Sequence, residues 1–183
     1  MGRILVMENL SLDGVMQAPG RPDEDTRDGF EQGGWFQQYN DEVLGRFLGR
    51  SMGSASGALL LGRRTYEDFF GFWPKQTDGN PFTAALDAAT KYVASTTLTE
   101  PLPWQNSTLL KGDVAEAVAS LKQQPGADIV ILGSGALIQS LMRRGTSANS
   151  GAALPITMVC ACSSTSSMES TISREMCGIL LRM

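Results

Sequence analysis

Residues 128–137 have the sequence DIVILGSGAL. The apolar run after Asp128 leads into glycine, serine and glycine, and helix-forming residues then continue to Arg144. This pattern predicts a short buried strand, a tight turn and a helix. In open α/β sheets ligands bind beyond the carboxyl ends of the strands, so the turn is a candidate binding site.

Similar apolar runs recur on the N-terminal side of this segment. Strands are predicted at residues 3–9, 58–61, 91–94, 107–110 and 128–132. Helices are predicted at residues 40–56, 65–73, 81–89, 113–124 and 135–144. Asp113 is the expected N-cap of its helix, and Thr65 and Asp68 have the spacing of a capping box. Strands that alternate with helices favour an α/β fold with a mostly parallel sheet covered on both faces.

Composition excludes several classes of function. The chain of 183 residues has a net charge of -4 and no basic patch, which argues against nucleic acid as a partner. It contains no histidine, and its three cysteines, Cys160, Cys162 and Cys177, form no C-x-x-C pair, so no metal site is expected. No signal peptide or membrane span is recognisable, and we predict a cytoplasmic protein with no membrane partner.

Three predicted strands are followed by residues suited to holding phosphate. The first set is Gly62, Arg63, Arg64 and Thr65, the second is Ser95, Thr96 and Thr97, and the third is Gly133, Ser134, Gly135, Ala136 and Leu137. Glycines allow the backbone to approach a phosphate closely, and helix N-termini present free N–H groups to it. Arginine binds a phosphate through two parallel hydrogen bonds. Each set alone is more often an ordinary turn or surface pair. Together they point to a ligand with a pyrophosphate and a 2′-phosphate, NADP rather than NAD.

The segments after the first predicted strand are candidates for the substrate side. In residues 11–14 (SLDG), Asp13 can contact a polar substrate or pass a proton, although Asp-Gly is more often a plain turn. Residues 20–34 form a long polar loop of the kind that often serves as a lid. Trp35 and Trp73 either line a substrate pocket or belong to the core. Because histidine is absent, the proton of a reduction must come from Asp13, a tyrosine or bound water.

Four motifs together resemble the dihydrofolate-reductase-like family, in the branch of the C-terminal reductase domain of riboflavin biosynthesis (the RibD C-terminal type). They are SLDG at 11–14, LLGRRTYE at 60–67, KYVAS at 91–95 and GSG at 133–135. The resemblance implies a three-layer α/β/α fold, NADPH as cofactor, and hydride transfer to a riboflavin-precursor pyrimidine or a pterin-like ring. It also implies cofactor phosphates on the three sets above, Asp13 toward the substrate as the catalytic residue, and a homodimer.

The resemblance ends near Gly145, which divides the chain into a domain at 1–145 and an atypical tail at 146–183. The tail is rich in serine and threonine and lacks the family's acidic segment and later Pro…Leu-Gly-x-Gly pattern. We favour a reading frame shifted after Gly145 over a diverged or disordered tail. Only residues 154–160 form a candidate strand, so C-terminal strands are expected to be missing or altered. An apolar sheet edge would then be exposed and solubility poor.

One further departure from the family pattern leaves the function open to alternatives. The acidic residue that dihydrofolate reductases carry on the first helix has no match, because Asp41 and Glu42 lie too early, so reduction of folate itself is not expected. A non-catalytic NADP-binding protein and an inactive remnant are the alternative hypotheses. NADPH binding without turnover of any substrate would favour the first, and a sample without cooperative unfolding would favour the second.

Overall fold

A computed structural model describes residues 4–11, 13–39, 58–77, 79, 81–124, 128–145 and 156–161. The predicted helix at 40–56, with Asp41 and Glu42, lies outside the described residues. So does the atypical tail, apart from residues 156–161.

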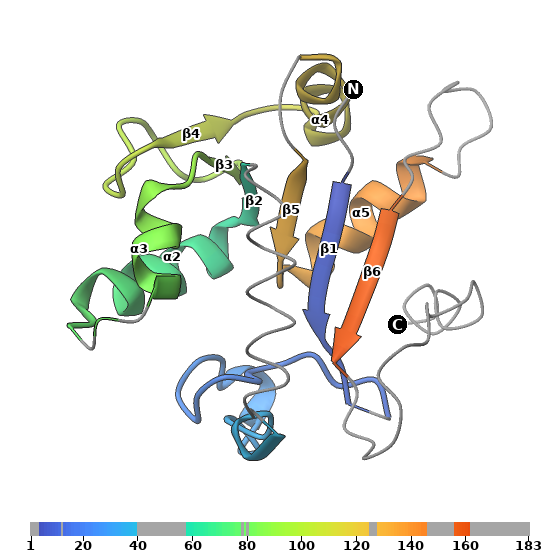
Figure 1. Ribbon diagram of the computed structural model, residues 1–183. Coiled ribbons are helices and arrows are strands. Elements are labelled where there is room, and N and C mark those ends of the chain that lie inside the picture. The colour runs from blue at the N-terminus through green and yellow to red at the C-terminus, as the bar shows by residue number, and fades with distance from the viewer. Residues whose placement is uncertain are drawn as a thin grey trace.

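A parallel sheet forms the centre of the described structure. Its strands are β1 (Ile4–Asn9), β2 (Leu59–Gly62), β3 (Lys91–Ala94), β4 (Ser107–Leu110), β5 (Ile129–Leu132) and β6 (Ile156–Ala161). Their order is β4-β3-β2-β5-β1-β6, and every neighbouring pair is parallel. In Figure 1 the arrows of β5, β1 and β6 lie side by side and point the same way. The five strands predicted upstream of Gly145 are therefore confirmed, with ends that differ by at most one residue.

Helices cover both faces of this sheet. They are α2 (Arg63–Phe72), α3 (Pro81–Ala88), α4 (Val114–Gln123) and α5 (Gly135–Gly145), and short 3-10 turns lie at Arg27–Gly29, Gln37–Tyr39 and Trp73–Lys75. Asp113 caps α4 as predicted, because its carboxylate accepts the N–H groups of Ala115 and Glu116. The fold is thus the expected three-layer α/β/α arrangement.

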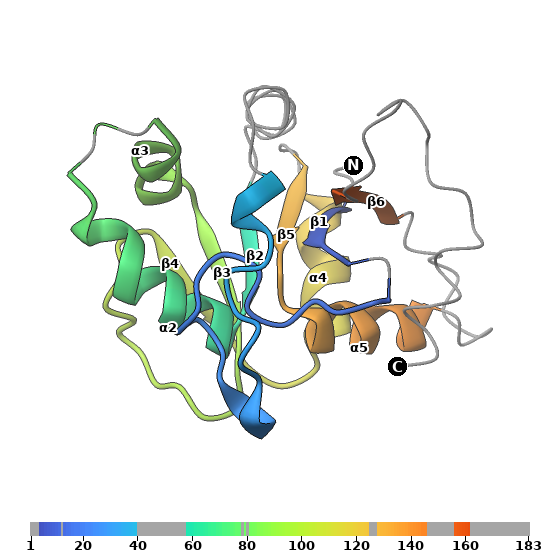
Figure 2. The same cartoon turned by 90° about the horizontal axis from the view of Figure 1, so that it is seen from below.

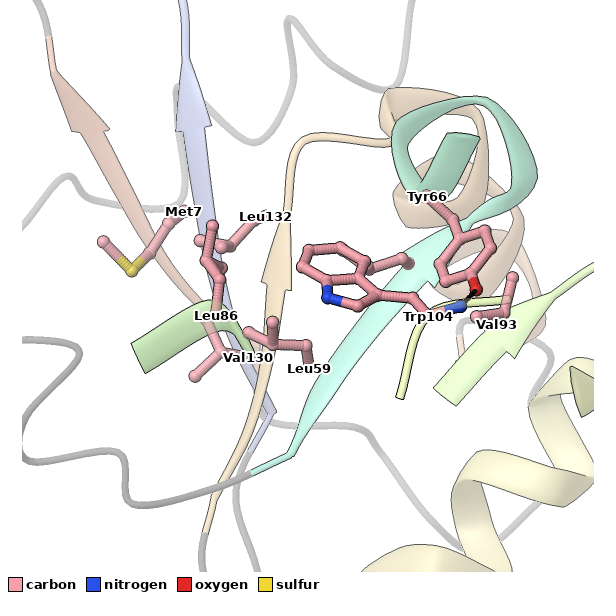
Figure 3. Close-up of a cluster of buried hydrophobic side chains, with 9 residues drawn as sticks. Met7, Leu59, Tyr66, Leu86, Val93, Trp104, Val130 and Leu132 are labelled. Carbon is pink, nitrogen blue, oxygen red and sulfur yellow. Dashed lines mark hydrogen bonds between the residues drawn. The ribbon is translucent and has the colours of Figure 1, made fainter. Parts of the chain in front are cut away.

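Alternation along the strands divides the core into two layers. Leu59 and Leu61 of β2 pack with Tyr66 and Leu86, from α2 and α3, on one face. Leu60 packs on the other face against residues of α4 and α5. Figure 3 shows the first layer, in which the Tyr66 hydroxyl accepts the backbone N–H of Trp104 at 3.0 Å. The alternation buries successive side chains of one strand on opposite faces, as a sheet between two helical layers requires.

The structure corrects the expected start of α2. The helix begins at Arg63, two residues before Thr65, and Gly62 is its N-cap without any side-chain hydrogen bond. Thr65 does not cap the helix, because its hydroxyl is hydrogen-bonded to Ser134 at 2.7 Å. A contact distant in sequence therefore replaces the local capping box.

The structure also bears on the expectation of an exposed apolar sheet edge, because one segment of the tail covers the edge of β1. Residues 156–161 lie inside the atypical tail, yet they form β6 and pair in parallel with β1 from Ile4↔Ile156 to Asn9↔Ala161. The sequence ITMVCA has the β-branched and apolar residues that favour a strand. The tail thus supplies a strand beside β1, close to the candidate at 154–160. The shifted reading frame and the domain division remain predictions.

Among the helices of the described ranges, none combines the length and apolar character that crossing a bilayer requires.

Candidate functional site

A cavity of about 1060 Å³ lies at the carboxyl ends of the central strands. Most of its lining comes from the segment after β1, the start of α2 and the start of α5, and further lining residues come from the end of β1, the end of α2 and α3. Figure 2 looks at the sheet from below and shows the segment after β1 crossing in front of β2 and β3. The cavity therefore occupies the position at which open α/β sheets bind ligands.

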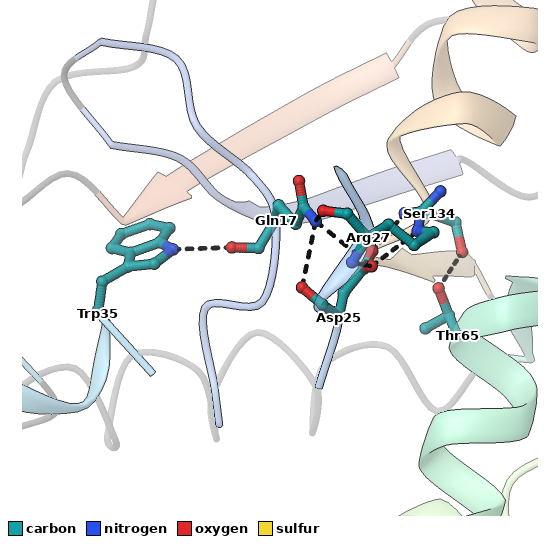
Figure 4. A network of polar contacts seen from close by, with 6 residues as sticks. All are labelled: Gln17, Asp25, Arg27, Trp35, Thr65 and Ser134. Carbon is teal, nitrogen blue, oxygen red and sulfur yellow. Dashed lines mark hydrogen bonds and ion pairs between the residues drawn. The ribbon is translucent and has the colours of Figure 1, made fainter. Parts of the chain in front are cut away.

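Ser134 joins the starts of α2 and α5. Its hydroxyl oxygen accepts the N–H of Gly62 at 2.9 Å and is hydrogen-bonded to the hydroxyl of Thr65 at 2.7 Å. Figure 4 shows this contact between Thr65 and Ser134. A Cβ at position 62 would lie 3.1 Å from the Ser134 hydroxyl, so the close approach of the two loops favours glycine there.

Two helix N-termini open onto the cavity. The first turn of α2 follows Gly62 with no side-chain cap, and α5 begins at Gly135 after two residues with positive φ, Gly133 (60°) and Ser134 (68°). The N–H groups of Leu137 and Ile138 donate to the Ser134 carbonyl. The ends of both helix dipoles, with backbone N–H groups, favour an anionic ligand between them.

The arginines of the first predicted set both line the cavity. Arg63 forms an i,i+4 ion pair with Glu67 at 3.0 Å, whereas Arg64 is exposed. Arg64 is thus the arginine of this pair whose guanidinium is not engaged by Glu67. It is positioned to offer the two-pronged contact that phosphate favours.

Only two of the three predicted phosphate-binding sets line the cavity. The cavity is lined by Gly62–Thr65 and by Gly133–Leu137, but the lining of the second loop stops at Ala94. In that loop the Ser95 hydroxyl accepts the N–H groups of Thr97 and Leu98, which forms a compact turn. The structure brings the first and third sets together, and the role of Ser95, Thr96 and Thr97 stays a prediction.

Asp13 lies at the exposed rim. Its carboxylate accepts a hydrogen bond of 2.6 Å from the Ser11 hydroxyl, which lowers the pKa of Asp13. The next residue, Gly14, lines the cavity, but Asp13 does not. The catalytic role predicted for Asp13 therefore stays a prediction without support from the geometry.

Glu8 is a cavity residue that the sequence interpretation did not single out. It lies near the carboxyl end of β1, is only 7% exposed, and its Oε2 is buried without a hydrogen-bond partner. Burial, with a smaller contribution from the Glu24 carboxylate, raises the pKa of Glu8 to about 8. A neutral carboxylic acid is thus held at the wall of the cavity at neutral pH.

Side chain and backbone contacts hold the segment after β1 in a compact loop. The Gln17 amide donates to the carbonyls of Asp25 and Arg27 at 3.1 and 3.0 Å, and Asp25 forms an ion pair with Arg27. The indole N–H of Trp35 donates to the Gln17 carbonyl at 2.9 Å. Figure 4 shows this network beside the Thr65–Ser134 contact. Trp73 lines the cavity, whereas Trp35 does not line it and instead stabilises the loop through its hydrogen bond to Gln17.

Arg21 fastens this loop to α2. Its guanidinium forms an ion pair with Asp68 and lies 4.3 Å from the centre of the Phe72 ring. The Arg21 and Asp68 side chains are 22% and 21% exposed, so solvent screens their attraction only in part. These contacts of Arg21 with Asp68 and Phe72 hold the loop, which forms one wall of the cavity, against α2.

Replacing Arg21 with alanine is expected to loosen the loop. The ion pair and the cation–π contact together contribute about 1 to 2 kcal/mol, so trypsin should cleave after the exposed Arg27 about tenfold faster. The control is Arg144→Ala, which removes the Arg144–Asp113 ion pair on the other side of the sheet. Equal rates of cleavage in Arg21→Ala and the native protein would contradict the claim that Arg21 holds the loop against α2.

Within the described ranges, no group of three or more Asp, Glu, Cys or His side chains is arranged to hold a metal ion.

Comparison with known proteins gives one family match. The sequence profile of the RibD C-terminal domain matches residues 3–147. No curated protein matches the sequence. Among solved structures, a protein from Shewanella sp. PV-4 described as a riboflavin biosynthesis protein is 19% identical, with a TM-score of 0.47 over 78% of this chain and 70% of that one.

Two dihydrofolate reductases also match. That of Enterococcus faecalis, solved with NADP(H) and RAB-propyl, is 15% identical, with a TM-score of 0.47 over 78% of this chain and 66% of that one. That of Schistosoma mansoni is 13% identical, with a TM-score of 0.48 over 92% of this chain and 78% of that one.

Proposed function

Because the chain belongs to the RibD C-terminal domain family, we propose that it is an NADPH-dependent reductase that transfers a hydride to a small heterocyclic substrate. Membership in this family supports a reductase-type function. The observation that carries the choice of cofactor is the joined start of α2 and α5, where two helix N-termini open onto one cavity. The proposed substrate is a riboflavin-precursor pyrimidine or a pterin-like ring.

The residues that join the starts of α2 and α5 fit the phosphates of a dinucleotide. Gly62 lets the backbone of α2 approach α5, and Ser134 fixes the distance between the two helix starts. We assign the pyrophosphate to the N–H groups at these starts and the 2′-phosphate to Arg64. The second predicted set, 95–97, would border the same ligand from the end of β3. When bound, the reduced nicotinamide supplies the hydride.

Three aromatic residues in the lining of the cavity suit a planar ring. Phe69 comes from α2, Trp73 from the 3-10 turn that follows it, and Phe82 from α3; the ring centres of Trp73 and Phe82 lie 4.8 Å apart. Aromatic faces bind flat heterocycles with little loss of side-chain freedom. The protein thereby orients the substrate and excludes water, which are the main tasks of a protein in cofactor-dependent reduction.

Thermal unfolding with NADPH and NADH in parallel tests the proposal. At a concentration one hundred times its Kd, a ligand adds about 2.7 kcal/mol of stability, which raises Tm by several degrees in a domain of this size. We expect this rise for NADPH and a much smaller one for NADH, because only NADPH offers a 2′-phosphate to Arg64. A cooperative transition unmoved by either nucleotide would contradict the cofactor assignment. NADPH binding without reduction of any heterocycle would instead favour a non-catalytic NADP-binding protein.

A further inference from the structure

The position of Glu8 in β1 is unusual for a charged residue. It follows Ile4 and Val6 in the two-residue alternation of the strand, and both of these side chains are fully buried. A carboxyl group at the next inward position faces a low-dielectric environment, in which its ionised form is costly. Burying such a group costs free energy unless a partner compensates, and no hydrogen-bond partner of its Oε2 exists in the part of the chain that the structure describes.

Burial, and after it the neighbouring charge of Glu24, raises the pKa of Glu8 and keeps its proton bound. The charged side chains that line the cavity are Arg21, Glu24, Asp25 and Arg27 from the loop and Arg63, Arg64 and Asp68 from α2. Of these, only Glu24 shifts the pKa of Glu8, and it shifts it upward. The carboxylate of Glu24 is occupied by the N–H groups of Gly20 and Arg21 at 2.7 and 3.1 Å. Glu8 is therefore the cavity carboxyl that combines deep burial, a free oxygen and a proton at neutral pH.

We propose that Glu8 is the proton donor of the reductase reaction, an inference that rests on the function proposed above. Hydride transfer to a ring carbon of a C=N or C=O bond leaves an electron pair on the heteroatom, which must take a proton. Glu8 supplies it: the O–H bond of the carboxyl breaks, an N–H or O–H bond forms on the substrate, and the carboxylate regains a proton from solvent. NADPH is oxidised and the ring is reduced, so electrons and protons balance.

The structure favours Glu8 over the other candidate donors. Asp13 is exposed, and its hydrogen bond with Ser11 favours the ionised form, which has no proton to give. Tyr66 is buried in the core with its hydroxyl bonded to the Trp104 N–H, and it does not line the cavity. A carboxyl group with a pKa near the working pH meets the requirement of a general acid.

The first experiment follows the carboxyl group directly. Carbon-13 NMR of glutamate-labelled protein, with Glu8→Gln to assign the signal, should give Glu8 an apparent pKa near 8 in the absence of any ligand. The variant Glu24→Gln should move this value downward, because it removes the neighbouring negative charge. A Glu8 signal that titrates in the ordinary range of glutamate would overturn the inference, whatever the enzyme reduces.

The second experiment measures NADPH oxidation with a dihydropterin and with a ribosylaminopyrimidine as probes. For the probe that is reduced, Glu8→Gln should lower kcat by about 100- to 10,000-fold with KM changed little, and the fall of kcat above the Glu8 pKa should disappear. In backbone register Glu8 lies opposite Cys160, and thiols titrate in the same pH range, so Cys160→Ser is the matched control and should keep that fall.

The outcomes separate the two proposals. If NADPH raises the Tm of Glu8→Gln as it does that of the native protein, and kcat is unchanged, only the role of Glu8 is overturned. Reduction of neither probe would overturn the inference together with the proposed reductase function.

Discussion

Replacing Ala136 with aspartate is expected to weaken NADPH binding roughly 100-fold while leaving the fold intact. Ala136 is exposed in the first turn of α5 and lines the cavity. A carboxylate in the first turn of a helix is favourable for the helix, so the free energy of unfolding should not fall. The same carboxylate repels a phosphate placed at that turn by about 3 kcal/mol at an effective dielectric constant near 20, which corresponds to roughly 100-fold weaker binding.

Isothermal titration with NADPH and thermal unfolding of the free protein measure the two effects separately. The matched control is Ser140→Asp, because Ser140 is exposed on the same helix, the change in net charge is identical, and the residue does not line the cavity. The control should bind NADPH like the native protein. Tight NADPH binding by Ala136→Asp would contradict the placement of the phosphates at the start of α5.

The stability of the native protein relative to Glu8→Gln is expected to fall as pH rises from about 5 to about 9. The pKa of Glu8 is raised from 4.5 to about 8 in the folded protein, so the folded state keeps a proton that the unfolded state has lost in this range. Below about pH 4.5 both states are protonated and Glu8 makes no difference. About one pH unit above the Glu8 pKa the cost of the buried carboxylate is complete, on the order of 5 kcal/mol.

Urea unfolding of both proteins across this pH range measures the difference. Glutamine has nearly the shape of protonated glutamic acid but does not titrate, so groups that do not interact with Glu8 contribute equally to both curves and cancel. The repulsion between Glu8 and Glu24 is part of the measured difference. The two proteins should have similar free energies of unfolding near pH 5 and should diverge with rising pH, with Glu8→Gln the more stable. A constant difference across the range would show that the Glu8 carboxyl is not held in a raised-pKa environment.

The strands and the phosphate loops could be predicted because local sequence determines them. The run IVIL before Gly133 and the run LLL before Gly62 are apolar, short and followed by turn residues, so each predicts a strand and its end. Which strands are neighbours is a tertiary property. The order that places β2 beside β5 brings Ser134 to Gly62, and no local pattern indicates that contact.

The same reason explains the corrections. Thr65 and Asp68 have the spacing of a capping box, but Ser134 binds the threonine hydroxyl and the helix begins earlier. Residues 156–161 have strand-forming composition inside a segment that departs from the family pattern, and pairing with β1 decides their structure. The local sequence indicated this strand as the candidate at 154–160, whereas its position beside β1 is a tertiary property that the composition of the tail does not indicate.

A signal for Glu8 was present in the sequence. In the strand ILVMEN the glutamate follows isoleucine and valine at two-residue spacing, so the alternation places it on a buried face. Its burial at the cavity and the electrostatic influence of Glu24 depend on how the loop after β1 returns over the sheet, and they required the structure. Asp13 was the more conspicuous acidic residue, since it stands in a motif, yet it lies at the exposed rim.

The central claim is that NADPH binds with its phosphates between the starts of α2 and α5. The most direct test is a two-dimensional NMR titration of nitrogen-15-labelled protein with NADPH, which follows the backbone amides individually. The account predicts the largest shifts at residues 62–65 and 133–137, with small shifts at the start of α4, where Asp113 already caps the helix. NADPH binding that shifts amides elsewhere and leaves both loops unchanged would contradict the account.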